Sequence, residues 1–208
     1  MKESKLKTVL TAIIDLLYVG ILWLLCSLPI LTLGPATTAL YYATVKRIRH
    51  ERGHLTKVFF AGFRQNFRQS FPMWLLYLAA LGLAWLDWYG YRQLAIPNSG
   101  LLSAFSGILA LPALLSFPWM FAYISRFSNS FGGSLKFVLF LTARNLGKTL
   151  ILTGELVLFL GISWMLPQLL PLLPGAFALL MSLTIEPVFQ LYTADQSTES
   201  GDDWYNES

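Results

Sequence analysis

Charged side chains are scarce in this sequence of 208 residues. Only 12% of its residues are Asp, Glu, Lys or Arg, whereas 55% are hydrophobic and the mean hydropathy is +0.57. An ordinary soluble domain is about 25% charged. The composition therefore excludes an ordinary soluble protein and leaves no room for a sizeable soluble domain beside a membrane-embedded one. We expect an integral membrane protein.

Cysteine is also almost absent. Cys26 is the only one, so this chain can form neither an internal disulfide nor a zinc site built from cysteines. The two histidines, His50 and His54, lie four residues apart in a basic segment with no third ligand nearby. We therefore expect no metal and no other cofactor.

Recognisable catalytic motifs are missing too. The sequence contains no nucleophile elbow, no phosphate-binding loop and no zinc-protease motif. No acid and base share an exposed surface in a way that nominates a reaction. We therefore expect that the protein is not an enzyme.

Long apolar runs, by contrast, are abundant. An α-helix needs about 20 apolar residues to cross a hydrocarbon core of about 30 Å. Beside the region 8–45, the runs that approach or exceed this length are 71–91, 101–124, 149–166 and 175–192. They predict an all-α protein, a polytopic transmembrane helical bundle of five or six spans, in which residues 1–194 form one integral membrane domain.

All the basic residues except Arg92 fall into three blocks along the chain. They are Lys2, Lys5 and Lys7; then Lys46, Arg47, Arg49, Arg52, Lys57, Arg64 and Arg68; then Arg126, Lys136, Arg144 and Lys148. Because short cytoplasmic loops carry an excess of Lys and Arg, all three blocks should lie in the cytoplasm, with an even number of spans between any two. The segment 195–208 has five acidic residues and no basic one, which predicts a disordered cytoplasmic tail.

The region 8–45 is interrupted by Pro29, Gly34 and Pro35. Proline removes a backbone donor and restricts the residue before it, and Pro35 suits the first turn of a new helix. A reversal at this break places the N-terminal lysines on the same side as the second basic block. The returning segment 36–45 is only about 15 Å long, so a single kinked span followed by an interfacial helix is the alternative.

A similar pattern recurs later in the chain. The matching positions are Pro29, Pro35, Lys57 and Asn66 in the first copy, and Pro112, Pro118, Lys136 and Asn145 in the second. The chain therefore either contains an internal repeat or shows a chance match between short motifs. Transporters often place the broken helices of repeated units near their substrate site, so these helix-break prolines are also candidate site residues.

The segment 55–71 has large apolar side chains at every fourth position, namely Leu55, Phe59, Phe63, Phe67 and Phe71. Lys57, Arg64 and Arg68 lie away from that face. A basic helix with an aromatic face is typical of the membrane interface, and 135–150 is a similar but less charged segment. These basic segments either anchor to anionic lipid or dock a cytoplasmic partner. We expect no nucleic acid, because the aromatic residues are not interleaved with the cations.

Three acidic residues lie within the predicted spans: Asp15, Glu155 and Glu186. Each is six or seven residues from the cytoplasmic end of its helix, which places all three roughly 10 Å below the inner boundary. An ionisable group in hydrocarbon is costly unless it is paired or hydrated. They therefore either form a buried acidic cluster that binds a proton or cation, or pair with basic side chains and hold the bundle together. The candidate partners are Arg64, Arg68, Arg126, Arg144 and Lys148.

The stretch LLYVGILWLLCSLPILTLGPATTALYYATVKRIR, followed by VFFAGFRQNFRQS, resembles the YesL family of bacterial integral membrane proteins, also described as domain of unknown function 624. The resemblance depends on the Gly-Pro-Ala-Thr signature at 34–37, the small and aromatic residues after it, the basic cluster, and the Phe-rich helix that ends near Asn66. It implies a multi-pass α-helical protein of the bacterial plasma membrane, with relatives associated with carbohydrate uptake and degradation. It supplies no catalytic or binding residue.

We therefore expect an accessory or regulatory membrane subunit whose partners are the lipid bilayer and carbohydrate transporter subunits. Its docking residues would be the basic residues of 46–68 and 126–148. The alternative is an autonomous secondary transporter or channel that uses Asp15, Glu155 and Glu186. Neither expectation specifies a substrate or an oligomeric state.

Overall fold

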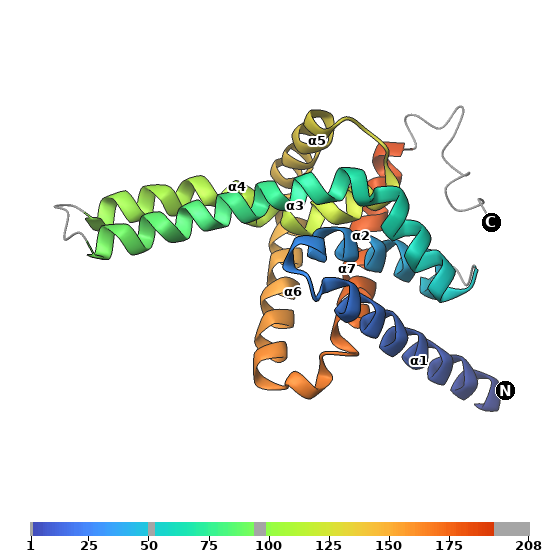
Figure 1. Cartoon of the computed structure of the whole chain (residues 1–208). Helices are drawn as coiled ribbons and strands as arrows, with labels where there is room; N and C mark the ends of the chain where they lie inside the picture. Colours follow the sequence, from blue (N-terminus) through green and yellow to red (C-terminus); the bar gives the residue numbers. More distant parts are fainter. Residues whose placement is uncertain (1, 50–52, 94–98, 194–208) are drawn as a thin grey trace.

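The structure is a computed structural model, and it describes residues 2–49, 53–93 and 99–193 (Figure 1). In chain order its elements are α1 (Lys2–Ser27), the 3₁₀ helix η1 (Ile30–Thr32), α2 (Leu33–Ala43), the π-helix η2 (Thr44–Arg49), α3 (Leu55–Gln93), α4 (Ser99–Arg126), α5 (Phe131–Arg144), α6 (Leu146–Met165), the 3₁₀ helix η3 (Pro167–Leu169) and α7 (Leu173–Thr193). No β-strand occurs within these three ranges, so the predicted all-α fold class is confirmed. The predicted tail 195–208 lies outside the described residues.

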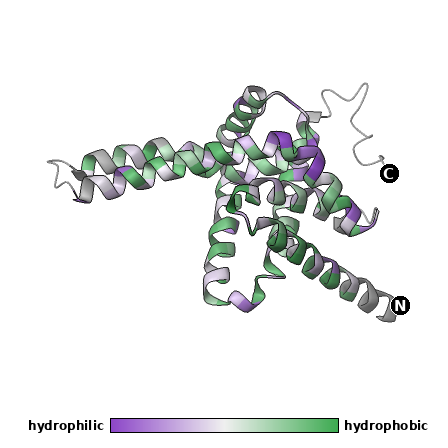
Figure 2. Cartoon of the chain, in the orientation of Figure 1, coloured by the Kyte–Doolittle hydropathy of each residue, from purple (hydrophilic) through white to green (hydrophobic). Residues whose placement is uncertain are grey.

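Five of these helices are long and apolar enough to cross a membrane: α1, α3, α4, α6 and α7. Their apolar stretches are Leu10–Ser27, Leu55–Gly90, Ala104–Arg126, Leu146–Met165 and Leu173–Tyr192. The surface of α6 exposes large hydrophobic side chains, such as Leu150 (65% exposed) and Trp164 (89%). Figure 2 shows hydrophobic residues along α6, whereas hydrophilic residues gather on the first half of α3. The chain is therefore a multi-span helical membrane protein.

The chain reverses its direction between α1 and α2. The Thr32 hydroxyl donates to the carbonyl oxygens of Cys26 (2.6 Å) and Pro29 (2.8 Å), which fixes the turn. Pro35 lies in the first turn of α2, where its missing N–H removes no helical hydrogen bond. Figure 1 shows α2 returning toward the side of the molecule on which α1 begins. How many times the region 8–45 crosses a bilayer stays a prediction.

The returning helix is short and lies inside the protein. α2 contains 11 residues, fewer than the roughly 20 that a full span needs. Most of its residues are buried, and Ala36 and Ala39 are 0% exposed. Short segments at membrane depth are tolerated when other helices cover them. The described part of the chain therefore has five long apolar helices and one short internal one, consistent with the predicted five or six spans.

Pro112 and Pro118 do not break their helix, which corrects the sequence prediction. Both lie inside the continuous helix α4. Proline is tolerated inside membrane helices that are packed against other helices, as α4 is packed against α3. The proline match between the two halves of the sequence therefore does not extend to local structure.

The two predicted amphipathic segments are not separate helices with the predicted bounds. The segment 55–71 is the first part of α3, a helix of 39 residues that continues through Pro72. The segment 135–150 is divided at Asn145, whose φ of −115° and ψ of 47° separate α5 from α6. An interior proline does not stop α3, whereas the non-helical backbone at Asn145 does separate two helices.

Asn66 and Asn145, which match in the proposed repeat, make the same local hydrogen bond. Each donates its side-chain amide to the carbonyl oxygen four residues earlier, at Gly62 (2.9 Å) and Leu141 (3.1 Å). The asparagines thus share a local role although only the second one ends a helix. The internal repeat itself stays a prediction.

Glycines bring α2 and α3 close together. A Cβ atom added to Gly34 would lie 2.4 Å from the Cβ of Trp74, and one added to Gly62 would lie 2.7 Å from a ring carbon of Tyr42. Small residues permit this close approach of membrane helices. Trp74 also donates its indole N–H to the carbonyl oxygen of Ile30 at 2.7 Å. The Gly-Pro-Ala-Thr signature therefore begins at a tight contact between helices.

The main core lies where α2, α3, α4 and α7 meet. Trp119 of α4 and Phe189 of α7 are both 0% exposed within it. Trp119 donates its indole N–H to the Thr149 hydroxyl at 3.0 Å, which connects α4 to α6. Figure 1 shows α3 and α4 extending side by side away from this core, while α6 and α7 extend in another direction. The core thus holds together two helix pairs that diverge.

Candidate functional site

A buried charged network joins three helices in the core. Arg126 at the end of α4 donates from Nη1 to Oε2 of Glu186 on α7 at 2.5 Å. The Tyr41 hydroxyl on α2 donates to the other carboxylate oxygen, Oε1, at 3.0 Å. The side chains of Arg126 and Glu186 are 4% and 1% exposed. Both oxygens of this buried carboxylate therefore accept a hydrogen bond from another helix.

Aromatic rings enclose the arginine of this network. The guanidinium carbon of Arg126 lies 5.6 Å from the ring centre of Phe127 and 5.8 Å from that of Phe189. A cation at this distance from an aromatic face gains favourable electrostatic energy. Burying two charges is expensive, and it is tolerated when the pair has good geometry and further hydrogen bonds. The surroundings of Arg126 and Glu186 meet these conditions.

Asp15 has a different partner. Its Oδ2 atom lies 3.4 Å from Nη2 of Arg47, and the side chains are 20% and 27% exposed, respectively. This pair connects α1 to η2, so it joins the two arms of the N-terminal hairpin. Arg47 was not among the partners considered from the sequence. The signal was available, because Arg47 lies in the returning arm of the same hairpin.

Glu155 lies on α6 and is half-buried. Its Oε2 atom is buried and has no hydrogen-bond partner among the described residues. A buried carboxylate oxygen without a partner is costly. Of the three predicted acids, Glu155 therefore has the least complete hydrogen bonding.

The three predicted acids thus differ in their partners and do not share one polar centre. Glu186 contacts Arg126 and Tyr41, Asp15 contacts Arg47, and Glu155 contacts neither of these arginines. Among the described ranges, no group of three or more His, Cys, Asp or Glu side chains could hold a metal ion. Asp15 and Glu186 connect separate segments of the bundle through their ion pairs. Whether any of them also carries a function stays a prediction.

A small cavity adjoins this network. It has a volume of about 30 Å³ and is lined almost entirely by apolar groups. Residues from four helices line it, namely Thr37, Leu40, Tyr41, Phe117, Pro118, Phe121, Ala122, Leu156, Phe177, Ala178 and Met181. About 10–15 Å³ of such volume accommodates one water molecule, so the cavity is far too small for a sugar. Tyr41 lines the cavity and also contacts Glu186, which links the two features.

The predicted docking cations do not form one exposed surface. Arg126 is buried and Arg47 is paired with Asp15, so neither belongs to an exposed docking surface. Lys46 is half-buried and donates to the Tyr42 hydroxyl at 3.2 Å. Five cations are exposed: Lys57, Arg64, Arg68, Lys136 and Arg144. Lys148 is half-buried, and the side chains of Arg49 and Arg52 lie outside the described residues.

Sequence reasoning missed two tryptophans that support the network. Trp74 packs on Gly34, as described above, and Trp23 donates its indole N–H to the Thr37 hydroxyl at 3.2 Å. Together they fix α2, which carries Tyr41. Their indole groups inside predicted spans were the available signal, because a buried indole N–H usually finds an acceptor.

These features define a helical membrane protein with a charged network in its interior. Residues 16–88 match the family described as "Protein of unknown function, DUF624". The match confirms the predicted resemblance to that family over a region that contains the Gly-Pro-Ala-Thr signature and Tyr41. It ends before Arg126 and Glu186. No curated protein and no solved structure matches the chain.

Proposed function

We propose that the protein is an accessory or regulatory subunit of a transport system in the bacterial plasma membrane, without enzymatic activity or cofactor. One observation carries this proposal: Glu186, the most deeply buried acid of the bundle, is engaged by Arg126 and Tyr41. A carboxylate held between three helices supports the bundle and is poorly placed to exchange ions. The apolar cavity beside it is also too small for a sugar.

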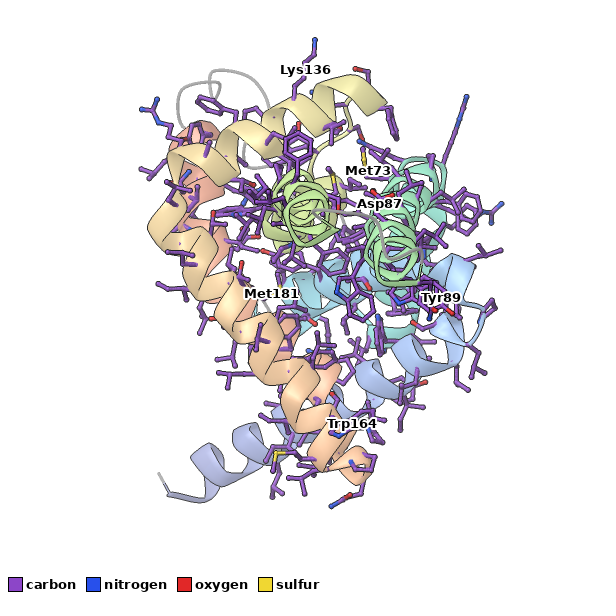
Figure 3. All side chains as sticks on the ribbon, turned by 90° about the vertical axis from the view of Figure 1, so that its left-hand side faces the viewer. Met73, Asp87, Tyr89, Lys136, Trp164 and Met181 are labelled. Carbon is purple, nitrogen blue, oxygen red and sulfur yellow. The ribbon has the colours of Figure 1, made fainter. Side chains whose placement is uncertain are left out.

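The docking surface of this subunit is the exposed side of α5. Gln69 donates to the Ser134 hydroxyl at 2.6 Å, and the rings of Phe137 and Phe140 contact Tyr192, so α5 is held firmly on the bundle. Lys136 is exposed and points away from the molecule in Figure 3. Arg144 is exposed as well and lies over the Phe140 ring. A rigid helix with outward cations suits an acidic surface on a cytoplasmic or membrane partner.

The class of partner comes from the family resemblance. Relatives associated with carbohydrate uptake favour the membrane subunits of a carbohydrate transporter as the partner. The test uses the double variant Lys136→Gln/Arg144→Gln, expressed at the natural level and purified in mild detergent. We expect co-purified transporter subunits to fall about fivefold, because each exposed charge contributes up to about 1 kcal/mol. Lys148→Gln is the matched control, since this half-buried lysine lies on α6. If the double variant and Lys148→Gln recover equal amounts of the transporter subunits, the exposed side of α5 is not the docking surface.

The second candidate is an autonomous transporter or channel, and Glu155 is the observation that favours it. Its buried, unpartnered oxygen is the feature expected of a group that binds a proton or cation. Glu155→Gln should then abolish the flux of protons or cations into proteoliposomes, while the yield of folded protein stays unchanged. If flux is absent in the unmodified protein, or survives this substitution, the transporter proposal loses its support.

A further inference from the structure

The first half of α3 departs from a simple amphipathic helix. Leu55 and Phe59 are 7% and 0% exposed, so they anchor the helix in the protein. The later aromatic residues turn outward: Phe63 and Phe67 have ring centres 5.5 Å apart and are half-buried. Phe60, outside the predicted apolar face, is 47% exposed. The aromatic surface therefore leaves the core and continues onto the outside of the molecule.

This outer surface forms an open concavity that contains a cation. Phe60, Phe63, Arg64 and Phe67 line it, and its volume is about 480 Å³. The concavity is open rather than enclosed, so it would cover only part of a bound molecule. Arg64 is exposed beside the three rings. The concavity thus combines an apolar wall of three aromatic rings with one positive group.

Two further cations extend the positive charge along the same side of α3. Lys57 and Arg68 are exposed and lie seven residues before and four residues after Arg64, a spacing that places all three on one helical face. Within the described residues, the ion pairs are Asp15–Arg47 and Arg126–Glu186. No carboxylate in that part of the chain therefore neutralises this stripe.

We propose that this concavity binds an anionic phospholipid, whose phosphate group contacts Arg64 and Arg68 and whose acyl chain lies over Phe60, Phe63 and Phe67. The apolar stretch Leu55–Gly90 includes the concavity and continues beyond it, so the site lies at the start of a span. Lipid head groups lie at that level, and cations there attract anionic lipids. A phospholipid supplies both a phosphate and a hydrocarbon chain, as the charge and the apolar wall require.

The proposal does not depend on any protein partner. It assigns the basic face of α3 to lipid, and it leaves α5 as the docking surface. The lipid site can therefore be tested on purified protein alone, and its failure is distinguishable from a failure of the proposed subunit role.

The experiment is native mass spectrometry of the purified full-length chain with added phosphatidylglycerol or phosphatidylcholine. We expect phosphatidylglycerol adducts in preference to phosphatidylcholine, and about a fivefold lower phosphatidylglycerol occupancy for Arg64→Gln. Lys148→Gln is the control, with occupancy as in the unmodified protein. Equal binding of the two lipids, or equal occupancy in the two variants, would overturn the proposal.

A second measurement needs no substitution in the protein. A photoactivatable phosphatidylglycerol with the reactive group on its acyl chain is added to the unmodified chain, and the cross-linked peptides are identified. Cross-links to 60–67 are expected. Cross-links confined to other segments would overturn the proposal, and displacement of the lipid by an acidic peptide at equal concentration would assign the concavity to a protein partner instead.

Discussion

Arg126 of α4 and Glu186 of α7 form an ion pair inside the bundle, 60 residues apart in the sequence. Tyr41 of α2 completes the hydrogen bonding of the carboxylate. The three residues come from three of the four helices that meet at the core. The network therefore connects α2 and α4 to α7, and two of the stability predictions concern it.

Glu186→Gln should destabilise the protein strongly, by about 3 kcal/mol, because it leaves the buried Arg126 charge without its counterion. Unfolding by titration with a denaturing detergent measures the loss. The double variant Arg126→Met/Glu186→Leu should recover most of it, since apolar residues of similar volume require no compensation. A double variant no more stable than Glu186→Gln would contradict the account of the pair.

Tyr41→Phe should lower the free energy of unfolding by about 2 kcal/mol, because it removes one hydrogen bond to a buried carboxylate. Tyr18→Phe is the matched control, since Tyr18 is 42% exposed and its hydroxyl contacts that of Thr56 at 3.1 Å. The same unfolding titration compares the two. If both substitutions lower the free energy of unfolding equally, the hydrogen bond from Tyr41 to Glu186 stabilises the protein no more than the exposed bond between Tyr18 and Thr56.

Asp15→Asn should have a small effect, below about 1 kcal/mol, because the pair with Arg47 is partly exposed and spans 3.4 Å. Salt screens the attraction between the two side chains. Raising the salt concentration should therefore lower the stability of the unmodified protein slightly, and the Asn variant should lack this part of the salt dependence. A loss as large as that of Glu186→Gln would show that Asp15 is more deeply involved than its exposure indicates.

Gly34→Ala should cost about 1–3 kcal/mol, because the new Cβ would lie 2.4 Å from the Cβ of Trp74 and must push α2 from α3. Gly82→Ala is the control. No atom lies within 4 Å of a Cβ at Gly82, so alanine there should be neutral or stabilising by up to about 1 kcal/mol. Thermal unfolding in detergent ranks the three proteins. Equal melting of the two variants would refute the tight contact.

Cysteines introduced at Lys5 and Lys57, in a Cys26→Ser background, should react with a membrane-impermeant reagent from the same side of the membrane. This result follows if the chain reverses between α1 and α2 and returns before α3. The reagent is applied to intact cells and to inverted vesicles. Labelling of the two positions from opposite sides would favour a single crossing of the region 8–45.

Composition and periodicity were enough to predict the all-α fold and the long apolar helices, because both depend on hydrophobicity summed over many residues. They were less reliable for local breaks. Pro112 and Pro118 were predicted to be breaks, yet α4 continues through both of them as one helix. Asn145, which does separate two helices, carries no strong signal of a break.

The interior site shows a related limit. Hydropathy identified Asp15, Glu155 and Glu186 as unusual, since each interrupts an apolar run. Their partners depend on how helices pack, and Tyr41 reaches Glu186 across 145 residues of sequence. Counting residues along each helix placed the three acids at one depth in the membrane. It could not show in which direction each side chain leaves its helix axis. The same applies to Phe60, which helical spacing put outside the apolar face and which lies beside Arg64 in the concavity.

The accessory role is the central claim, and co-purification tests it most directly. The unmodified chain, expressed at its natural level, is solubilised from the native membrane in mild detergent, and the proteins recovered with it are quantified by mass spectrometry. The account predicts stoichiometric recovery of membrane transporter subunits. Recovery of this chain alone, in a folded state and with its lipids bound, would contradict it and favour an autonomous transporter that uses Glu155.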